Sequence, residues 1–174
     1  YDHDGYFFLH NLLSITGQFT SQPFIDKDLV VMYNGEIYNH ESFGIDCESD
    51  GEVIIPLYKK YGKKLFKYLD GEFAIVIYDF AQREILVGTD TFATKPVWIG
   101  KDSERCGVAS YESVLKGVGF DNAYKIPANS LLVLDLDTFK LKNRFQIREF
   151  DLRQHKDTFD DCLQAFSNAI AKRT

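Results

Sequence analysis

The residues of this 174-residue chain best suited to chemistry are Asn34, Gly35 and Glu36, which follow the apolar run Val30-Val31-Met32-Tyr33. The Asn-Gly pair tolerates positive φ, so we expect a strand over about residues 29–33 to end there in a sharp turn. An exposed backbone N–H beside a side-chain amide can hold a developing oxyanion, and a neighbouring carboxylate can bind an ammonium group. The dipeptide alone favours a plain hairpin turn, which is the alternative interpretation.

A second carboxylate, that of Asp50, stands at the start of a predicted helix. Ser49 and Glu52 have the spacing of a capping box, which places Asp50 in the first helical turn. A carboxylate at this position interacts favourably with the helix dipole and needs no ligand. Local context alone therefore favours a structural role for Asp50.

The rest of the pattern predicts short strands around two central helices. Near-continuous apolar runs predict strands over 73–78, 85–88 and 130–136 that are covered on both faces. The capped helix should end at Gly62 and be followed by a second from about Lys63 to Leu69, while Pro56 predicts a kink or a later helix start. This order of elements is typical of a layered α+β sandwich.

Composition and charge exclude several classes of protein. The formal net charge of −6 argues against a nucleic-acid partner, and no apolar run approaches the length of a membrane span. Cys47, Cys106 and Cys162 are odd in number and widely spaced, which indicates unpaired thiols in a reducing compartment and hence a cytoplasmic location. We predict no metal site, because neither His10 nor His40 has a second histidine at ligand spacing.

The string Asn34-Gly35-Glu36-Ile37-Tyr38-Asn39-His40, followed by Ser49-Asp50-Gly51-Glu52-Val53-Ile54, resembles the glutaminase domain of glutamine-hydrolysing asparagine synthetases, which are class II glutamine amidotransferases. Further segments follow the family's order and approximate spacing: residues 10–15, Gln22-Pro23, Gly71-Glu72-Phe73-Ala74, Ile77-Tyr78-Asp79, Asp90, Lys95-Pro96 and Val108-Ala109-Ser110. The resemblance implies an N-terminal-nucleophile hydrolase-like fold, a four-layer αββα sandwich that would be N-terminally incomplete here.

The resemblance also implies roles for four residues. The side-chain amide of Asn34 and the backbone N–H of Gly35 would form the oxyanion hole, while Glu36 and Asp50 would bind the ammonium group of glutamine. The implied reaction hydrolyses glutamine to glutamate and ammonia, for transfer to an acceptor such as aspartate. The family nucleophile is a cysteine at the mature N-terminus, whose own amine takes the thiol proton.

Two departures from the family pattern bear on activity. Leu12 stands where the resemblance implies an arginine that grips the substrate carboxylate, and an apolar side chain cannot replace that contact. None of the three cysteines lies near the N-terminus, so we expect the nucleophile among several tens of residues missing before Tyr1. The chain as written, a fragment, is therefore predicted not to hydrolyse glutamine.

We expect two segments: the class II glutamine amidotransferase-like domain over residues 1–155, and a helix over 156–174 that leads toward an absent synthetase domain. Phe159, Leu163, Phe166 and Ile170 recur at helical spacing in the second segment. ATP and magnesium are expected only in the synthetase domain, so we predict no cofactor for this chain. The expected partners are glutamine and that covalently linked domain, with no membrane and with the oligomeric state open.

Three hypotheses follow from these observations. The chain is part of a working amidotransferase, a degenerate glutaminase-like scaffold as in β-lactam synthetase-like relatives, or an amino-acid-binding module that uses Glu36 and Asp50. Leu12 favours the scaffold, whereas the intact Asn34, Gly35, Glu36 and Asp50 favour the enzyme.

Overall fold

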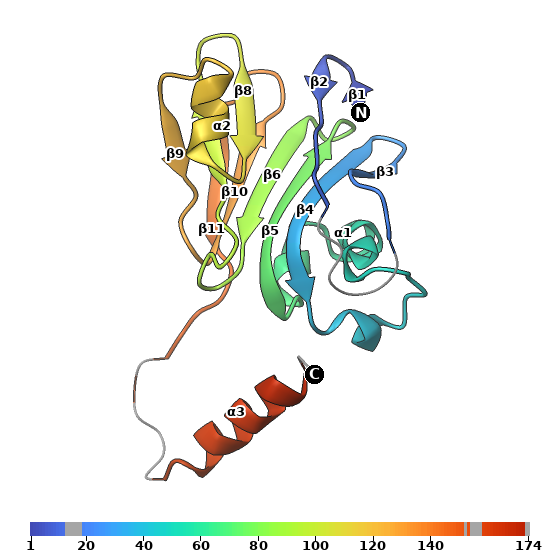
Figure 1. Ribbon diagram of the computed structural model, residues 1–174, viewed down its shortest axis with the longest axis vertical. Coiled ribbons are helices and arrows are strands. Elements are labelled where there is room, and N and C mark those ends of the chain that lie inside the picture. The colour runs from blue at the N-terminus through green and yellow to red at the C-terminus, as the bar shows by residue number, and fades with distance from the viewer. Residues whose placement is uncertain (13–18, 152, 154–157, 173–174) are drawn as a thin grey trace.

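The computed structural model describes residues 1–12, 19–151, 153 and 158–172. A six-stranded antiparallel sheet with the strand order β11-β10-β6-β5-β4-β3 forms its centre (Figure 1). Its strands are β3 (Phe24–Asp26), β4 (Leu29–Ile37), β5 (Gly71–Asp79), β6 (Glu84–Thr89), β10 (Ser130–Asp135) and β11 (Leu141–Gln146). The motif residues Leu13, Ser14 and Ile15 and the segment boundary predicted at 155 and 156 lie outside the described residues.

One face of this central sheet is covered by smaller β structures (Figure 1). A three-stranded sheet has the order β8-β7-β9, and a short hairpin pairs β1 with β2. Ile99 of the small sheet and Phe8, which directly follows β2, share a buried cluster with Val76 of the central sheet. The bounds are β1 (Asp2–His3), β2 (Tyr6–Phe7), β7 (Trp98–Lys101), β8 (Cys106–Ala109) and β9 (Ala123–Lys125).

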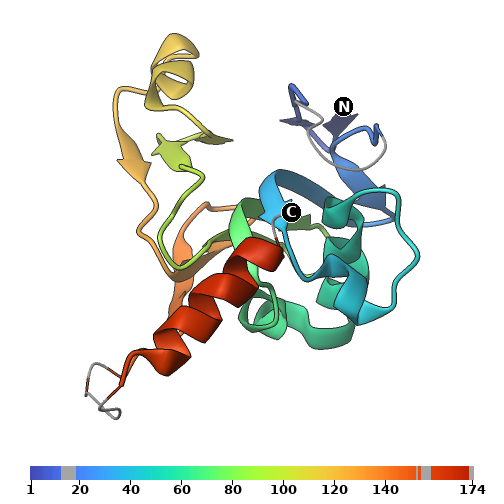
Figure 2. The same ribbon diagram turned by 60° about the horizontal axis from the view of Figure 1, so that its bottom comes forward.

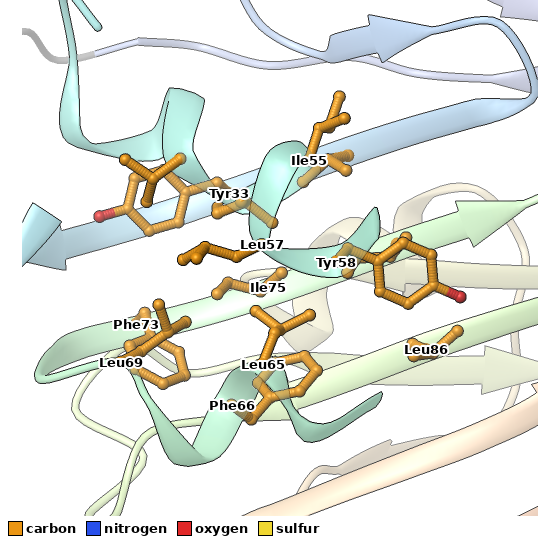
Figure 3. Packing of buried hydrophobic residues seen from close by; sticks show 14 of the residues in the cluster. Tyr33, Ile55, Leu57, Tyr58, Leu65, Phe66, Leu69, Phe73, Ile75 and Leu86 are labelled. Atoms are coloured by element: carbon orange, nitrogen blue, oxygen red, sulfur yellow. The ribbon is translucent and has the colours of Figure 1, made fainter. Parts of the chain in front are cut away.

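Helices cover the other face of the central sheet. Figure 3 shows Leu57 and Phe66, from the helical segments, packed in one cluster with Ile75 of β5. A further short helix, α2, packs against the three-stranded sheet. The helical segments are η1 (His40–Phe43), η2 (Asp50–Val53), α1 (Ile54–Tyr61), η3 (Gly62–Lys67) and α2 (Glu112–Gly117). The layers therefore run helix, sheet, sheet, helix, which confirms the predicted α+β sandwich.

The strand β5 shows why the continuous apolar runs form buried strands. Ile75 and Ile77 belong to the cluster under the helices, whereas Val76 and Tyr78 belong to the cluster under the small sheet. Successive side chains of a strand point to opposite faces, so a strand between two packed layers needs apolar residues at every position. The prediction that these strands are covered on both faces is confirmed for β5.

The prediction that β4 ends at Tyr33 is wrong. The strand continues to Ile37, and Asn34, Gly35 and Glu36 pair with residues of β5 instead of forming a turn. The conformational freedom of Gly35, which has φ of +151°, is used here inside a strand. The long buried partner strand provides ladder hydrogen bonds that outweigh the local turn preference of Asn-Gly.

The first central helix begins later than the capping box implies, as Pro56 predicted. Asp50–Val53 forms a 3₁₀ turn and the α-helix starts at Ile54, so Pro56 lies in the first α-helical turn, where its missing N–H costs little. The second predicted helix is a 3₁₀ segment, Gly62–Lys67.

The helix α3 (Asp160–Ala171) lies outside the layers (Figure 1, Figure 2). An ion pair of 2.5 Å joins Lys172, next to its C-terminal end, to Asp70. The apolar residues that predicted this helix are exposed, with Phe159 at 82% and Phe166 at 65%. Within the part of the chain that the structure describes, no helix is long and apolar enough to cross a membrane.

Candidate functional site

Asn34 and Glu36 lie on the face of the central sheet that the small sheet covers. Alternation along β4 places them on the same face as Val30, which is buried in the cluster beneath that small sheet. Toward the end of β4 this covering stops, and Asn34 is exposed while Glu36 is half-buried. The amide of Asn34 and the carboxylate of Glu36 therefore lie on the same face of the central sheet, beyond the part that the small sheet covers.

The backbone N–H groups along β4 show where the Gly35 donor points. The N–H of Tyr33 donates to Gln22 Oε1 at 2.9 Å, and the N–H of Ile37 donates to Asp50 Oδ2 at 2.6 Å. Both side chains lie on the edge of β4 away from β5. Because N–H direction alternates along a strand, the N–H of Gly35 faces this same edge. Among the described residues, neither a side chain nor a backbone carbonyl accepts it.

Only glycine fits at position 35. A Cβ built there would lie 2.1 Å from the backbone oxygen of Glu72 on β5, and the φ of +151° is one that other residues rarely adopt. This close approach fixes the Gly35 backbone against β5.

Asp90 holds the β5 residue that is paired with Gly35. Its buried carboxylate accepts the N–H of Phe73 at 3.0 Å, and its own N–H donates to the carbonyl of Phe73 at 3.0 Å. The same carboxylate accepts the N–H groups of Phe92 and Thr94. The turn after β6 therefore fixes the end of β5, and through it the position of Gly35.

Asp50 anchors β4 to the helical layer. Its Oδ2 accepts the Ile37 N–H and the hydroxyl of Tyr33. Since both donors use Oδ2, Oδ1 faces no donor among these contacts and can accept one from a ligand. The local interpretation of Asp50 as a helix-dipole carboxylate is therefore incomplete, because its position also depends on two donors from β4.

The charges of Asp50 and Glu36, the two carboxylates predicted to bind an ammonium group, both act on the hydroxyl of Tyr33. Burial first, then the charge and hydrogen bond of Asp50, and then the charge of Glu36 raise the pKa of Tyr33 far above its usual value. The phenol therefore remains a neutral donor.

Glu36 has a like-charged neighbour, Glu72, directly opposite on β5. Like charges at such paired positions repel each other, but Lys95 Nζ lies 3.2 Å from Glu72 Oε1 and offsets that charge. The sequence named Glu72 and Lys95 only as parts of motifs, and assigned no role to Gln22 or Tyr33 at the site. Strand register places Glu72 opposite Glu36, whereas Gln22 and Lys95 reach these strands from loops through a hydrogen bond and an ion pair.

The structure places Asn34, Gly35 and Glu36 in sequence along the end of β4, and Asp50 binds that strand at Tyr33 and Ile37, one residue before and one residue after them. Leu12 lies in the described segment 1–12 with its side chain 37% exposed, and it offers no charge for a substrate carboxylate.

The three cysteines are free thiols, as predicted. Burial raises the pKa of the Cys106 thiol to about 11, and burial together with nearby carboxylates raises the pKa of Cys47. Both thiols are therefore protonated, and weakly nucleophilic, at neutral pH.

The fold is that of a solved amidotransferase. Glutamine phosphoribosylpyrophosphate amidotransferase from B. subtilis, complexed with ADP and GMP, matches 74% of this chain and 32% of its own chain with a TM-score of 0.61. The sequence identity is 21%, so this likeness concerns the fold. The architecture is that of the N-terminal-nucleophile hydrolase class.

The sequence comparisons define the family. The family model described as "Glutamine amidotransferase domain" matches residues 10–117, more than half of the chain. The glutamine-hydrolysing asparagine synthetase of Mus musculus is 35% identical across 95% of this chain and 32% of its own length. Asparagine synthetase 1 of Saccharomyces cerevisiae is 34% identical across 63% of this chain and 21% of its own length. The chain therefore belongs to the class II glutamine amidotransferase domain family, and it spans a third or less of these relatives' lengths.

The buried phenol of Tyr33 predicts a loss of stability in alkali. A tyrosine whose pKa is raised in the folded state contributes stability that is complete below its unfolded pKa of about 10 and lost as the pH rises above it. Tyr33→Phe should lower the free energy of unfolding at pH 8 by about 1 kcal/mol, through loss of the hydrogen bond to Asp50. Above pH 10 the free energy of unfolding of Tyr33→Phe should fall less steeply than that of the wild type. The difference between the two slopes should be about 1.4 kcal/mol per pH unit.

Urea denaturation at pH 8 and at several values between about pH 10 and 11.5 measures both effects. Tyr111→Phe is the matched control because Tyr111 is 65% exposed. Identical pH profiles for the wild type and Tyr33→Phe would show that the hydroxyl of Tyr33 titrates normally.

Proposed function

We propose that this domain binds glutamine and stabilises the oxyanion formed when its side-chain amide is hydrolysed to glutamate and ammonia. The observation that carries the proposal is the placement of the Gly35 N–H on an open strand edge, beside the exposed amide of Asn34. Two preorganised donors of this kind are the usual requirement for an acyl-transfer oxyanion hole.

The carboxylates of Glu36 and Asp50 suit the ammonium group of the same substrate. Glu36 adjoins Gly35 in sequence, and Asp50 keeps Oδ1 for a donor while Oδ2 holds β4. A ligand bound through its ammonium here would have its position fixed relative to the oxyanion donors, and such positioning is a large part of catalysis.

The proposed nucleophile is a cysteine that precedes Tyr1 in the parent protein. The raised pKa values of Cys47 and Cys106 make these thiols unsuited to that role, and Cys162 lies on the outlying helix α3. Ammonia would pass to an acceptor such as aspartate in a linked synthetase domain, where ATP and magnesium would bind. The likeness to proteins named asparagine synthetases supports this part of the proposal.

A non-catalytic scaffold is the second candidate function. Leu12 supports it, because the resemblance places an arginine there to pair with the substrate carboxylate, and a leucine cannot do so. The scaffold hypothesis predicts no glutamine binding, whereas both the enzyme and the amino-acid-binding hypotheses require it.

Glutamine binding to the 174-residue chain therefore tests the proposal. Isothermal titration calorimetry should detect weak binding, and Glu36→Gln should reduce the affinity at least tenfold, since a hydrogen bond to a charged group contributes about 1.5–3 kcal/mol. Asp50→Asn should abolish binding, with circular dichroism used to confirm that the variant is folded.

Glu41→Gln is the matched control, because Glu41 is exposed on η1, outside the site. Its affinity for glutamine should equal that of the wild type. No heat with glutamine, glutamate or asparagine, or equal affinity in Glu36→Gln, would contradict the proposal.

Restoring a cation at position 12 should strengthen glutamine binding. Leu12→Arg is expected to raise the affinity roughly tenfold, by adding a charge-assisted pair with the α-carboxylate. Glutaminamide, which lacks that carboxylate, should gain nothing. Leu9→Arg adds the same charge to a side chain that is 86% exposed in the same segment and should leave both affinities unchanged. An equal gain for both ligands would exclude a specific carboxylate contact.

A further inference from the structure

The position at which β3 stops pairing with β4 determines whether the N–H of Gly35 is hydrogen-bonded within the sheet. Phe24 pairs with Val31, and Asp26 pairs with Leu29. Continuing this antiparallel register would place residue 22 opposite Tyr33 and residue 20 opposite Gly35. The backbone carbonyl of residue 20 would then accept the N–H of Gly35, and no donor would remain for an oxyanion.

The side chain of Gln22 replaces the backbone at the first of these positions. Its Oε1, 2.9 Å from the N–H of Tyr33, takes the place that its own carbonyl would take in a continued ladder. Tyr33 is therefore satisfied without another step of strand pairing. β3 pairs with β4 only as far as Val31.

On the other side of Gly35, the side chain of Asp50 also replaces a backbone acceptor, because its Oδ2 accepts the N–H of Ile37. An open strand edge is a template for a further strand, which would bond every second N–H in turn. Here side-chain oxygens accept hydrogen bonds from the outward N–H groups on both sides of Gly35, those of Tyr33 and Ile37. A strand that paired across this edge would have to displace both.

We propose that Gln22 is a positioning residue of the oxyanion site: its side-chain carbonyl ends the β3–β4 ladder and thereby keeps the Gly35 N–H out of the sheet. The importance of that donor rests on the proposed function. The arrangement itself is independent of substrate, so it can be tested on the 174-residue chain alone.

Amide hydrogen exchange followed by NMR measures each of these donors separately. In the wild type the Gly35 amide should exchange at least tenfold faster than those of Tyr33 and Ile37. Gln22→Met removes the acceptor at similar side-chain length and should raise exchange at Tyr33 at least tenfold relative to Val76 of β5. A purely structural role would raise exchange at Tyr33 and Val76 alike.

Rescue and control variants sharpen the test. Gln22→Glu keeps a side-chain oxygen acceptor and should retain the protection of the Tyr33 amide. Gln82→Met changes an exposed glutamine and should alter the exchange rate of neither the Tyr33 nor the Gly35 amide. Protection of Gly35 equal to that of Tyr33 in the wild type would overturn the proposal. So would unchanged protection of Tyr33 in Gln22→Met.

Glutamine titration of the same samples separates this inference from the proposed function. Weaker glutamine binding by Gln22→Met, together with the predicted exchange pattern, supports both. The predicted exchange pattern without any glutamine binding by the wild type supports the role of Gln22 in the sheet edge and contradicts the proposed function.

Discussion

The candidate site depends on the pairing of β4 with β5 past Tyr33, through to Ile37. This pairing puts Asn34 and Glu36 on one face of the sheet and turns the Gly35 N–H toward the opposite edge. It also brings Gly35 so close to the Glu72 carbonyl that a side chain at position 35 would collide with it. A turn at Asn34-Gly35 would point the side chains of Asn34 and Glu36 and the Gly35 N–H in other directions, whereas pairing with β5 fixes the direction of each.

Two carboxylates outside β4 hold this geometry from either side. Asp90 binds both backbone groups of Phe73, the β5 residue paired with Gly35. Asp50 binds the N–H of Ile37 and the hydroxyl of Tyr33, which joins the helical layer to the strand edge. Hydrogen bonds from the turn after β6 and from the start of η2 therefore provide the rigidity that the proposed oxyanion hole would require.

The sequence predicts the layers well and the local geometry of the site less well. Strands such as β5 are recognisable because burial on both faces demands apolar residues at every position. The grouping of Glu36 with Asp50 came from the family resemblance, because local context explained Asp50 without a ligand. The path of β4 was mispredicted because Asn-Gly suits a turn as well as a close strand approach. Gln22 and Asp90 act through contacts between distant parts of the chain, which no local pattern reveals.

Ammonia release by a protein that joins this chain to the proposed N-terminal cysteine tests the proposed function most directly. With glutamine as substrate, the account predicts release by the wild type and a fall in kcat of about 10²–10³ for Asn34→Ala, the usual effect of removing one oxyanion-hole donor. Asn122→Ala, at an exposed asparagine away from β4, should retain wild-type activity. Ammonia release that is unchanged in Asn34→Ala, or absent from the wild type, would contradict the account.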